Sequence, residues 1–273
     1  MSIRLVAVDV DGTLVTADQR VLPRVQDAVR RAAAQGVELV LCTGRAIGEC
    51  WYVLDALPEI RYAVTHTGAM AQDLKTGELL YHCPLSADDA RLIYSHLRRY
   101  DGLINFFSGG IVYNSKVQID NFERYYPSFR WLFERSHEFV DDLDALVAGW
   151  DKPVEKFYVP FSGPEVCRQA WADLSQLPYF VTGAGFVDLE VMNPATNKGL
   201  ALAALCRALG VPAEQVMAIG DSGNDAAMLD FAGVGVAMGN GEDALKQRAD
   251  LVAPSNELGG VADMLELVLQ GGV

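Results

Sequence analysis

The chain has 273 residues, of which 51% are hydrophobic and 21% charged, and its formal net charge is −14. This is the composition of a globular protein, and an acidic balance without lysine or arginine clusters argues against nucleic acid or an anionic membrane as the main partner. No apolar run approaches the ~20 residues of a membrane span, and five cysteines without C-x-x-C pairing predict a reducing, cytoplasmic location.

The N-terminal part of the chain alternates strand and helix patterns. Mostly apolar runs, continuous at residues 5–8, predict strands at residues 3–8, 37–42 and 62–65, and helix patterns cover residues 23–35 and 46–57. Strands that alternate with helices at short spacing are typical of a parallel sheet covered by helices on both faces.

The middle of the chain differs in composition. Residues 83–189 contain 20 of the 25 aromatic residues. Two strand patterns, 103–107 and 111–114, flank a Ser-Gly-Gly turn and predict a hairpin, and helix patterns cover residues 87–99 and 164–174. We expect a separate α+β module here, inserted into the first domain, with a hinge where the chain crosses between the two.

The C-terminal part returns to the first pattern. Its predicted elements are a helix at 197–209, a strand at 216–219, a helix at 224–231, a strand at 234–238, a helix from residue 242 and a strand at 251–253. The predicted fold class is therefore α/β: a Rossmann-like parallel-sheet core formed by residues 1–82 and 190–273, with an inserted α+β cap domain at 83–189.

Two carboxylates close together follow the first strand. Asp9 and Asp11 stand one residue apart and are followed at once by Gly12 and Thr13. Like charges at this separation raise one another's pKa and resist joint ionisation unless a cation or a proton lies between them. The pair therefore requires a partner from elsewhere in the chain or from a ligand.

Other polar residues follow the ends of the other core strands, where ligands bind in open parallel sheets. They are Thr43, Gly44 and Arg45 after the second strand, Lys198 near the start of a helix, and Asp221, Asn224 and Asp225 after the strand at 216–219. Asp221, Asp9 and a carbonyl of the first loop offer the hard oxygen ligands that Mg²⁺ prefers. Thr43 and Lys198 can bind a phosphate, as can free N–H groups at a helix start. Arg45 either contacts the substrate or pairs with an acid.

This set suits phosphoryl transfer, which needs positioning and charge neutralisation more than covalent chemistry. One carboxylate can attack phosphorus and form an acyl-phosphate. Its neighbour two residues along can protonate the leaving oxygen and later activate water.

At this point the sequence resembles the haloacid dehalogenase superfamily of phosphohydrolases. The segments "DVDGT", Thr43 in "CTGR", Lys198 in "NKG" and "GDSGND" match its four motifs in order, and the insert and "GVGVAMGN" resemble the Cof-like hydrolases. The resemblance implies Asp9 as nucleophile and Asp11 as general acid/base and carbonyl ligand of Mg²⁺. It also implies Thr43 and Lys198 on the phosphate, Asp221 on the metal, and Asn224 and Asp225 as supporting residues, Asp225 behind the metal ligands.

Two segments depart from the family pattern: His66-Thr67-Gly68-Ala69, where Asn-Gly-Ala is frequent, and "MNPATNKG" before the lysine. The predicted function is a cytoplasmic Mg²⁺-dependent phosphatase acting on small phosphorylated metabolites such as sugar phosphates, with no nucleic-acid or membrane partner. A phosphomutase of the same superfamily and a non-catalytic sensor of phosphorylated metabolites are the alternatives. The sequence does not indicate the oligomeric state.

Overall fold

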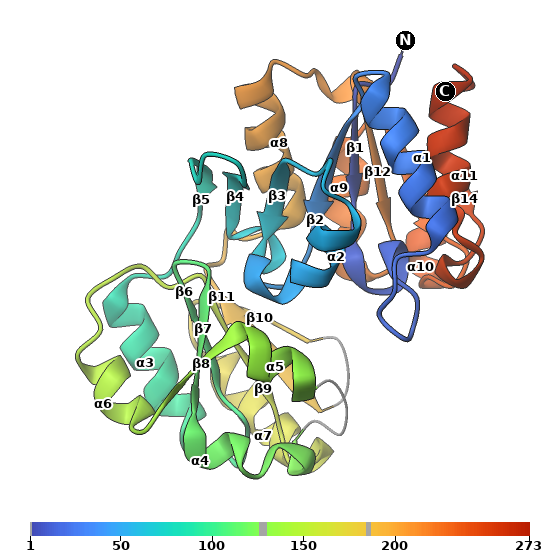
Figure 1. The fold of residues 1–273 in the computed structure, drawn as a ribbon. Helices are drawn as coiled ribbons and strands as arrows, with labels where there is room; N and C mark the ends of the chain where they lie inside the picture. The colour runs from blue at the N-terminus through green and yellow to red at the C-terminus, as the bar shows by residue number, and fades with distance from the viewer. Residues whose placement is uncertain (1, 126–129, 184–186) are drawn as a thin grey trace. The chain divides into compact units, whose positions relative to one another are not determined.

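The structure is a computed structural model that describes residues 2–125, 130–183 and 187–273. The chain divides into two compact units, and each is described by itself (Figure 1). The first unit consists of Met1–Arg45, Cys50–His82 and Asn197–Val273, and the second of Ala46–Glu49 and Cys83–Thr196.

An eight-stranded sheet forms the centre of the first unit. Its strands are β1 (Leu5–Val8), β2 (Glu38–Cys42), β3 (Tyr62–Thr65), β4 (Met70–Asp73), β5 (Leu79–His82), β12 (Val216–Gly220), β13 (Val234–Met238) and β14 (Leu251–Ala253). Their order is β14-β13-β12-β1-β2-β3-β4-β5, and the strands from β14 to β3 run parallel. The sheet confirms the predicted α/β core. Two antiparallel strands, β4 and the edge strand β5, extend the sheet beyond β3, and the sequence patterns did not indicate them.

Helices cover both faces of this sheet. The helices of the first unit are α1 (Pro23–Ala34), α2 (Trp51–Ala56), α8 (Lys198–Leu209), α9 (Ala226–Phe231), α10 (Asp243–Lys246) and α11 (Gly260–Leu269). One core cluster joins Leu5 and Ala7 of β1 to Leu202 of α8 and Met228 of α9. Helices α1 and α11 lie side by side (Figure 1). Because alternate side chains of a strand point to opposite faces, the buried run of β1 can fill both layers.

Short helical turns connect these elements at the sites where the sequence predicted longer helices or loops. They are η1 (Val10–Leu14), η2 (Ile47–Cys50), η3 (His66–Gly68), η5 (Ala213–Gln215), η6 (Gly223–Asp225) and η7 (Asn256–Leu258). The helices predicted at 46–57 and 224–231 therefore begin as tight turns, and only their second parts, α2 and α9, are α-helical. Gly48 and Gly223 lie in these turns, and glycine is a poor helix former.

A six-stranded sheet forms the centre of the second unit. Its strands are β6 (Asn105–Ser108), β7 (Ile111–Ser115), β8 (His137–Val140), β9 (Lys156–Pro160), β10 (Phe180–Thr182) and β11 (Asp188–Met192). Their order is β10-β11-β9-β6-β7-β8, antiparallel except for β7 and β8. Gly109 and Gly110, both at positive φ, close the β6–β7 hairpin, as predicted from the sequence.

The described part of the second unit also contains five helices. They are α3 (Ala87–Leu97), α4 (Lys116–Ile119), α5 (Arg130–Ser136), α6 (Leu143–Ala148) and α7 (Pro164–Leu174), with the turn η4 (Phe122–Arg124). Ile93 of α3, Val147 of α6 and Ala170 of α7 share one core cluster with Phe106 and Phe157 of the sheet. Strand β11 pairs with β9 and β10, so the second unit extends to Thr196, beyond the boundary predicted at residue 189.

The helices of the described ranges have at most 12 residues each. None of them is both long enough and apolar enough to cross a membrane.

Candidate active site

The predicted site residues of the first unit follow the carboxyl ends of neighbouring parallel strands. Asp9 follows β1, Thr43 follows β2 and Asp221 follows β12. Strand β1 lies between the other two, with Leu5 opposite both Val216 and Glu38. Their carboxyl ends therefore meet at one edge of the sheet, where open α/β sheets bind ligands.

Lys198 is at the centre of the site. Its Nζ donates hydrogen bonds to Oδ1 of Asp9 (2.7 Å) and Oδ1 of Asp225 (2.6 Å), and its side chain is wholly buried. The start of α8 is fixed by Asn197, whose side chain accepts a hydrogen bond from the backbone N–H of Leu200 (2.8 Å). The two carboxylates, which follow different strands, are thus joined by one buried ammonium group.

Gly68 allows the loop after β3 to approach the start of α8. Its φ is +98°, and a Cβ at this position would lie 2.3 Å from the carbonyl carbon of Asn197 and 2.6 Å from the backbone nitrogen of Lys198. No side chain fits such a gap between two backbones, so a glycine is required here. At His66 and Thr67, both at positive φ, the sequence departs from the family pattern, but the glycine of that pattern is present as Gly68.

The carboxylate of Asp225 is fully engaged by the protein. Oδ1 accepts from Lys198, while Oδ2 accepts from the backbone N–H groups of Asp221 (2.9 Å) and Ser222 (3.1 Å). Asp225 therefore fixes both the lysine and the loop that carries Asp221. The supporting role that the resemblance implied for Asp225 stays a prediction.

Asp221 faces the loop after β1. Its Oδ1 accepts a hydrogen bond from the hydroxyl of Thr13 (3.1 Å). Gly12 has φ +75°, and a Cβ there would lie 2.5 Å from Oδ2 of Asp221. The "DGT" segment thus supplies the hydroxyl group of Thr13, which donates to Asp221, and a glycine that leaves room for the same carboxylate. The amide of Asn240, which sequence reasoning did not single out, donates to the carbonyl of Gly12 (2.8 Å).

Two carboxylates of this site, those of Asp9 and Asp221, bind protons more tightly than usual. Burial raises the pKa of Asp9 well above its ordinary value, with Asp225 adding to the effect and Lys198 opposing it. Burial and the charge of Asp225 raise the pKa of Asp221 to about 6. Burial lowers the pKa of Lys198, but the charges of Asp225 and Asp9 outweigh it and raise that pKa. The negative charge of the carboxylates in this site therefore exceeds the positive charge of Lys198.

A divalent cation fits this excess of charge. Carboxylate oxygens of Asp9, Asp221 and Asp225 lie within 4.8 Å of one another. Because Asp225 is already bound by Lys198 and two backbone N–H groups, Asp9 and Asp221 are the members that can act as ligands. A donor set made of oxygen alone suits a hard cation.

Thr43 lies at the end of β2 and is buried. Its hydroxyl oxygen accepts a hydrogen bond from the backbone N–H of Arg45 (3.1 Å), which leaves the hydroxyl hydrogen able to donate to a ligand. Gly44 lies between them in the same turn. The backbone N–H of Thr67 donates to the carbonyl of Thr43 (3.1 Å), so the loop after β3 supports this turn.

Asp11 and Asn224 have more exposed environments. The carboxylate of Asp11 accepts two hydrogen bonds from Arg45, at 2.7 Å and 2.6 Å. Asn224 is exposed, and its amide oxygen accepts a hydrogen bond from the hydroxyl of Ser222 (3.2 Å) instead of joining the carboxylate cluster. Arg45 thus takes the acid-pairing alternative that the sequence left open.

Comparison with known proteins assigns the chain to a family. Residues 6–265 match the family model of the haloacid dehalogenase-like hydrolases. The chain belongs to this family. The resemblance inferred from its four motifs, to the haloacid dehalogenase superfamily and the Cof-like hydrolases within it, is confirmed.

Relatives cover nearly the whole length of this hydrolase. YxeH of Bacillus subtilis is 33% identical over 97% of this chain and 98% of its own length. YcsE of the same species, named a 5-amino-6-(5-phospho-D-ribitylamino)uracil phosphatase, is 28% identical over 96% of this chain and 94% of its own. The crystal structure of a haloacid dehalogenase-like hydrolase from Bacteroides thetaiotaomicron is 25% identical, with a TM-score of 0.86 over 97% of this chain and 99% of that one.

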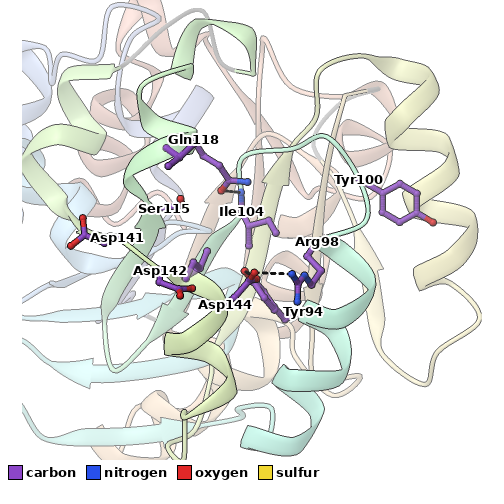
Figure 2. Close-up of a pocket in the computed structure, with 11 residues that line it drawn as sticks. Tyr94, Arg98, Tyr100, Ile104, Ser115, Gln118, Asp141, Asp142 and Asp144 are labelled. Carbon is purple, nitrogen blue, oxygen red and sulfur yellow. Dashed lines mark hydrogen bonds and ion pairs between the residues drawn. The ribbon is translucent and has the colours of Figure 1, made fainter.

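A pocket of about 280 Å³ lies in the second unit of this hydrolase, apart from the predicted site residues (Figure 2). Its polar side chains form hydrogen bonds with one another: Asp144 accepts from the hydroxyl of Tyr94 (2.7 Å) and from Arg98 (2.7 Å). Gln118 binds the backbone of Ile104 and Gly102. The polar side chains that line the pocket therefore stabilise the loops of the second unit.

Proposed function

We propose that this hydrolase is a Mg²⁺-dependent phosphatase that releases phosphate from small phosphorylated metabolites through an aspartyl-phosphate on Asp9. The observation that carries the proposal is the buried contact of Lys198 with Asp9 and Asp225, next to Asp221. YcsE, named for a small phosphate ester, supports this substrate class. Sugar phosphates and similar phosphomonoesters are the first candidates. The cytoplasmic location remains a prediction.

The metal is assigned to oxygen ligands of the first unit. Asp9 and Asp221 would bind it through carboxylates and Asp11 through its main-chain carbonyl, with Asp225 behind them. When bound, Mg²⁺ neutralises negative charge on the ligands and on the phosphate oxygens. The raised pKa values of Asp9 and Asp221, caused first by burial and then by neighbouring carboxylates, support this assignment, because a bound cation stabilises the ionised form of both groups.

In the first step, an oxygen of Asp9 attacks phosphorus. Because Lys198 binds Oδ1, we assign the attack to Oδ2. The new O–P bond forms as the bond from phosphorus to the leaving oxygen breaks, and that oxygen takes the electron pair and a proton from the carboxyl group of Asp11. Of the predicted phosphate-binding set, Thr43, Gly44, Lys198 and Asn224 are assigned to the phosphate, whereas Arg45 is paired with Asp11.

In the second step, water attacks the phosphorus of the aspartyl-phosphate. Asp11, now a carboxylate, takes a proton from this water, and the bond between phosphorus and Asp9 breaks with its electron pair returning to the carboxylate. Inorganic phosphate leaves, and Asp9 and Asp11 regain their starting states. The exposure of Asp11 supports this double role, since both the leaving group and water must reach it.

Phosphate release from p-nitrophenyl phosphate tests the nucleophile. We expect the Asp9→Asn variant to lose about 10³-fold or more in kcat, because no aspartyl-phosphate can form. Asp27→Asn on α1 is the matched control, since Asp27 is exposed and pairs with Arg30 at the surface. Undiminished turnover by Asp9→Asn would contradict the assignment of Asp9.

Removal of the metal tests the cofactor. We expect EDTA to abolish turnover and Mg²⁺ to restore it, whereas Ca²⁺, with its larger coordination sphere, restores little. Full activity in EDTA would overturn the metal assignment. Conversion of a sugar phosphate to its isomer without free phosphate would instead identify a phosphomutase. Tight binding of phosphorylated metabolites without any turnover would identify a sensor.

A further inference from the structure

The loop after β13 contacts two of the loops that form the candidate active site. It consists of residues 239–242, which are the last two residues of "GVGVAMGN" and the two that follow, and we call it the 239–242 loop. The side-chain amide of Asn240 donates to the carbonyl of Gly12 (2.8 Å), in the loop after β1. The backbone N–H of Glu242 donates to the carbonyl of Asp221 (2.8 Å), in the loop after β12. One short segment therefore joins the two loops.

The amide of Asn240 is held in one orientation. Its Oδ1 accepts a hydrogen bond from the backbone N–H of Asn256 (3.0 Å), while its Nδ2 donates to Gly12. Exchanging the two amide atoms would place donor against donor and acceptor against acceptor. The side chain of Asn256 in turn donates to the carbonyl of Val15 (2.8 Å), so the loop after β14 also binds the segment that follows β1. The position of the Asn240 amide is therefore fixed from both sides.

The 239–242 loop packs directly on the backbone of Asp221. A Cβ at Gly241 would lie 2.7 Å from the carbonyl oxygen and 3.0 Å from the Cα of Asp221. The turn is closed by a hydrogen bond from the backbone N–H of Gly241 to the carbonyl of Met238 (2.9 Å). Because a side chain at position 241 would push the loop away, glycine is what allows Glu242 to reach the carbonyl of Asp221.

These contacts complete a closed ring of covalent and hydrogen bonds that passes through Asp221. The hydroxyl of Thr13 donates to Oδ1 of Asp221 (3.1 Å), and a peptide bond joins Thr13 to Gly12. From Gly12 the ring continues through Asn240 to Glu242, whose backbone N–H returns to the carbonyl of Asp221. The same ring therefore holds both the carboxylate and the main chain of Asp221.

We propose that Asn240 positions the carboxylate of Asp221 as a ligand of the divalent cation. The inference rests on the proposed function and deepens it. Asn240 is a positioning residue, which acts through the peptide group of Gly12 and the hydroxyl of Thr13. Side chains that orient metal ligands from behind contribute about 10- to 100-fold to metal affinity. An aspartate without such support rotates among several rotamers and loses that freedom only when the ion binds.

The affinity for Mg²⁺, measured by isothermal titration calorimetry at pH 8, tests this role without turnover. We expect Kd to rise about tenfold in Asn240→Ala and in Thr13→Val, since each substitution removes one hydrogen bond of the ring. Asn240 is exposed, so its replacement leaves no cavity in the core. Thr13→Val keeps the shape of a buried side chain and removes only its hydroxyl group.

Asn193→Ala in the second unit is the matched control. The side chain of Asn193 accepts from the backbone N–H of Ala195 (3.0 Å) and donates to the carbonyl of Pro84 (2.9 Å). This is the bonding pattern of Asn240, without the connection to Asp221. We expect Asn193→Ala to bind Mg²⁺ as the unmodified protein does.

The double variant Thr13→Val/Asn240→Ala tests whether the two side chains act through one ring. If either substitution opens the same ring, the double variant should lose about tenfold in affinity, like each single variant. Two independent contacts would instead add, which predicts a loss of about a hundredfold.

The melting temperature in EDTA separates positioning from general support of the fold. It should fall by similar amounts in Asn240→Ala and Asn193→Ala, because each variant loses two side-chain hydrogen bonds. An unchanged Kd in Asn240→Ala, a hundredfold loss in the double variant, or an equal loss of affinity in Asn193→Ala would overturn the proposal while leaving the proposed function in place. Absence of Mg²⁺ binding by the unmodified protein would overturn the metal assignment of the proposed function, and this inference with it.

Discussion

Replacing Lys198 by methionine removes the cationic partner of two buried carboxylates. The lysine amine lies 2.7 Å from Asp9 and 2.6 Å from Asp225, and its side chain is 0% exposed. Methionine fills a similar volume without the charge, so the substitution leaves little cavity. The effect on stability therefore comes from the two carboxylates left without a counter-charge.

The size of that effect follows from burial. Breaking a buried ion pair by removing one partner costs about 3–5 kcal/mol, since the remaining charge stays desolvated. For comparison, Lys246 lies 3.4 Å from Asp243, whose side chain is 92% exposed. Such surface pairs contribute about 0–1 kcal/mol. We therefore expect Lys198→Met to cost at least about 3 kcal/mol at pH 8 and Lys246→Met less than about 1 kcal/mol.

The loss of stability caused by Lys198→Met should depend on pH. Lys198 lowers the pKa of Asp9, which burial raises, so its removal raises that pKa further. A folded protein whose acid has a raised pKa binds the proton more tightly than the unfolded chain, so stability falls as pH rises toward the folded-state pKa. The penalty of Lys198→Met should therefore be smaller at pH 5 than at pH 8.

Native-state hydrogen exchange of the β1 and β12 amides, in EDTA, measures the opening of this unit directly. The double variant Lys198→Met/Asp225→Asn removes one of the uncompensated charges, and it should regain about 1 kcal/mol or more relative to Lys198→Met. A penalty for Lys198→Met no larger than that for Lys246→Met, or one that grows toward pH 5, would refute the reasoning.

Three other predictions concern the first unit. Hydrogen bonds from Arg61 hold the pKa of Asp73 at about 2, so this carboxylate stabilises the fold above its ordinary pKa and the benefit is lost toward pH 2; the urea midpoint of Asp73→Asn should lie below that of the unmodified protein at pH 7, with the gap closing below pH 4. Gly68→Ala should lower the melting temperature far more than Gly77→Ala, because both positions have positive φ but only a Cβ at Gly68 meets backbone atoms; equal shifts would contradict the steric argument. Mg²⁺ affinity measured by calorimetry should rise with pH through about 6 as Asp221 loses its proton, and an affinity independent of pH would exclude Asp221 as a ligand.

The parallel part of the first sheet was predictable because its strands are continuous apolar runs. The run ending at Val8 is buried throughout, as a central parallel strand must be. Strands β4 and β5 were missed because "MAQD" and "LLYH" lack β-branched side chains, and because β5 lies at the sheet edge and is only partly buried. Thr76-Gly77 between them is a turn signal that could have identified this hairpin.

The site was predictable to the level of loops but not of side-chain partners. Topology brings Asp9, Thr43 and Asp221 to one edge of the sheet, and this follows from their position after parallel strands. Arg45 binds Gln19 and Asp11, which lie 26 and 34 positions away in the sequence, and both contacts depend on side-chain rotamers. Gln19 in a left-handed turn carries no motif that indicates such a contact.

The two acids that open the sequence receive different counter-charges from the chain itself. The sequence required one cation for the repulsion between Asp9 and Asp11, and the structure supplies two: buried Lys198 for Asp9 and partly covered Arg45 for Asp11. Because each carboxylate is oriented by its own partner, the buried one can serve as the nucleophile while the exposed one exchanges protons with the leaving group and water. A substitution at Arg45 should therefore disturb the orientation of Asp11 and leave the contact of Lys198 with Asp9 in place.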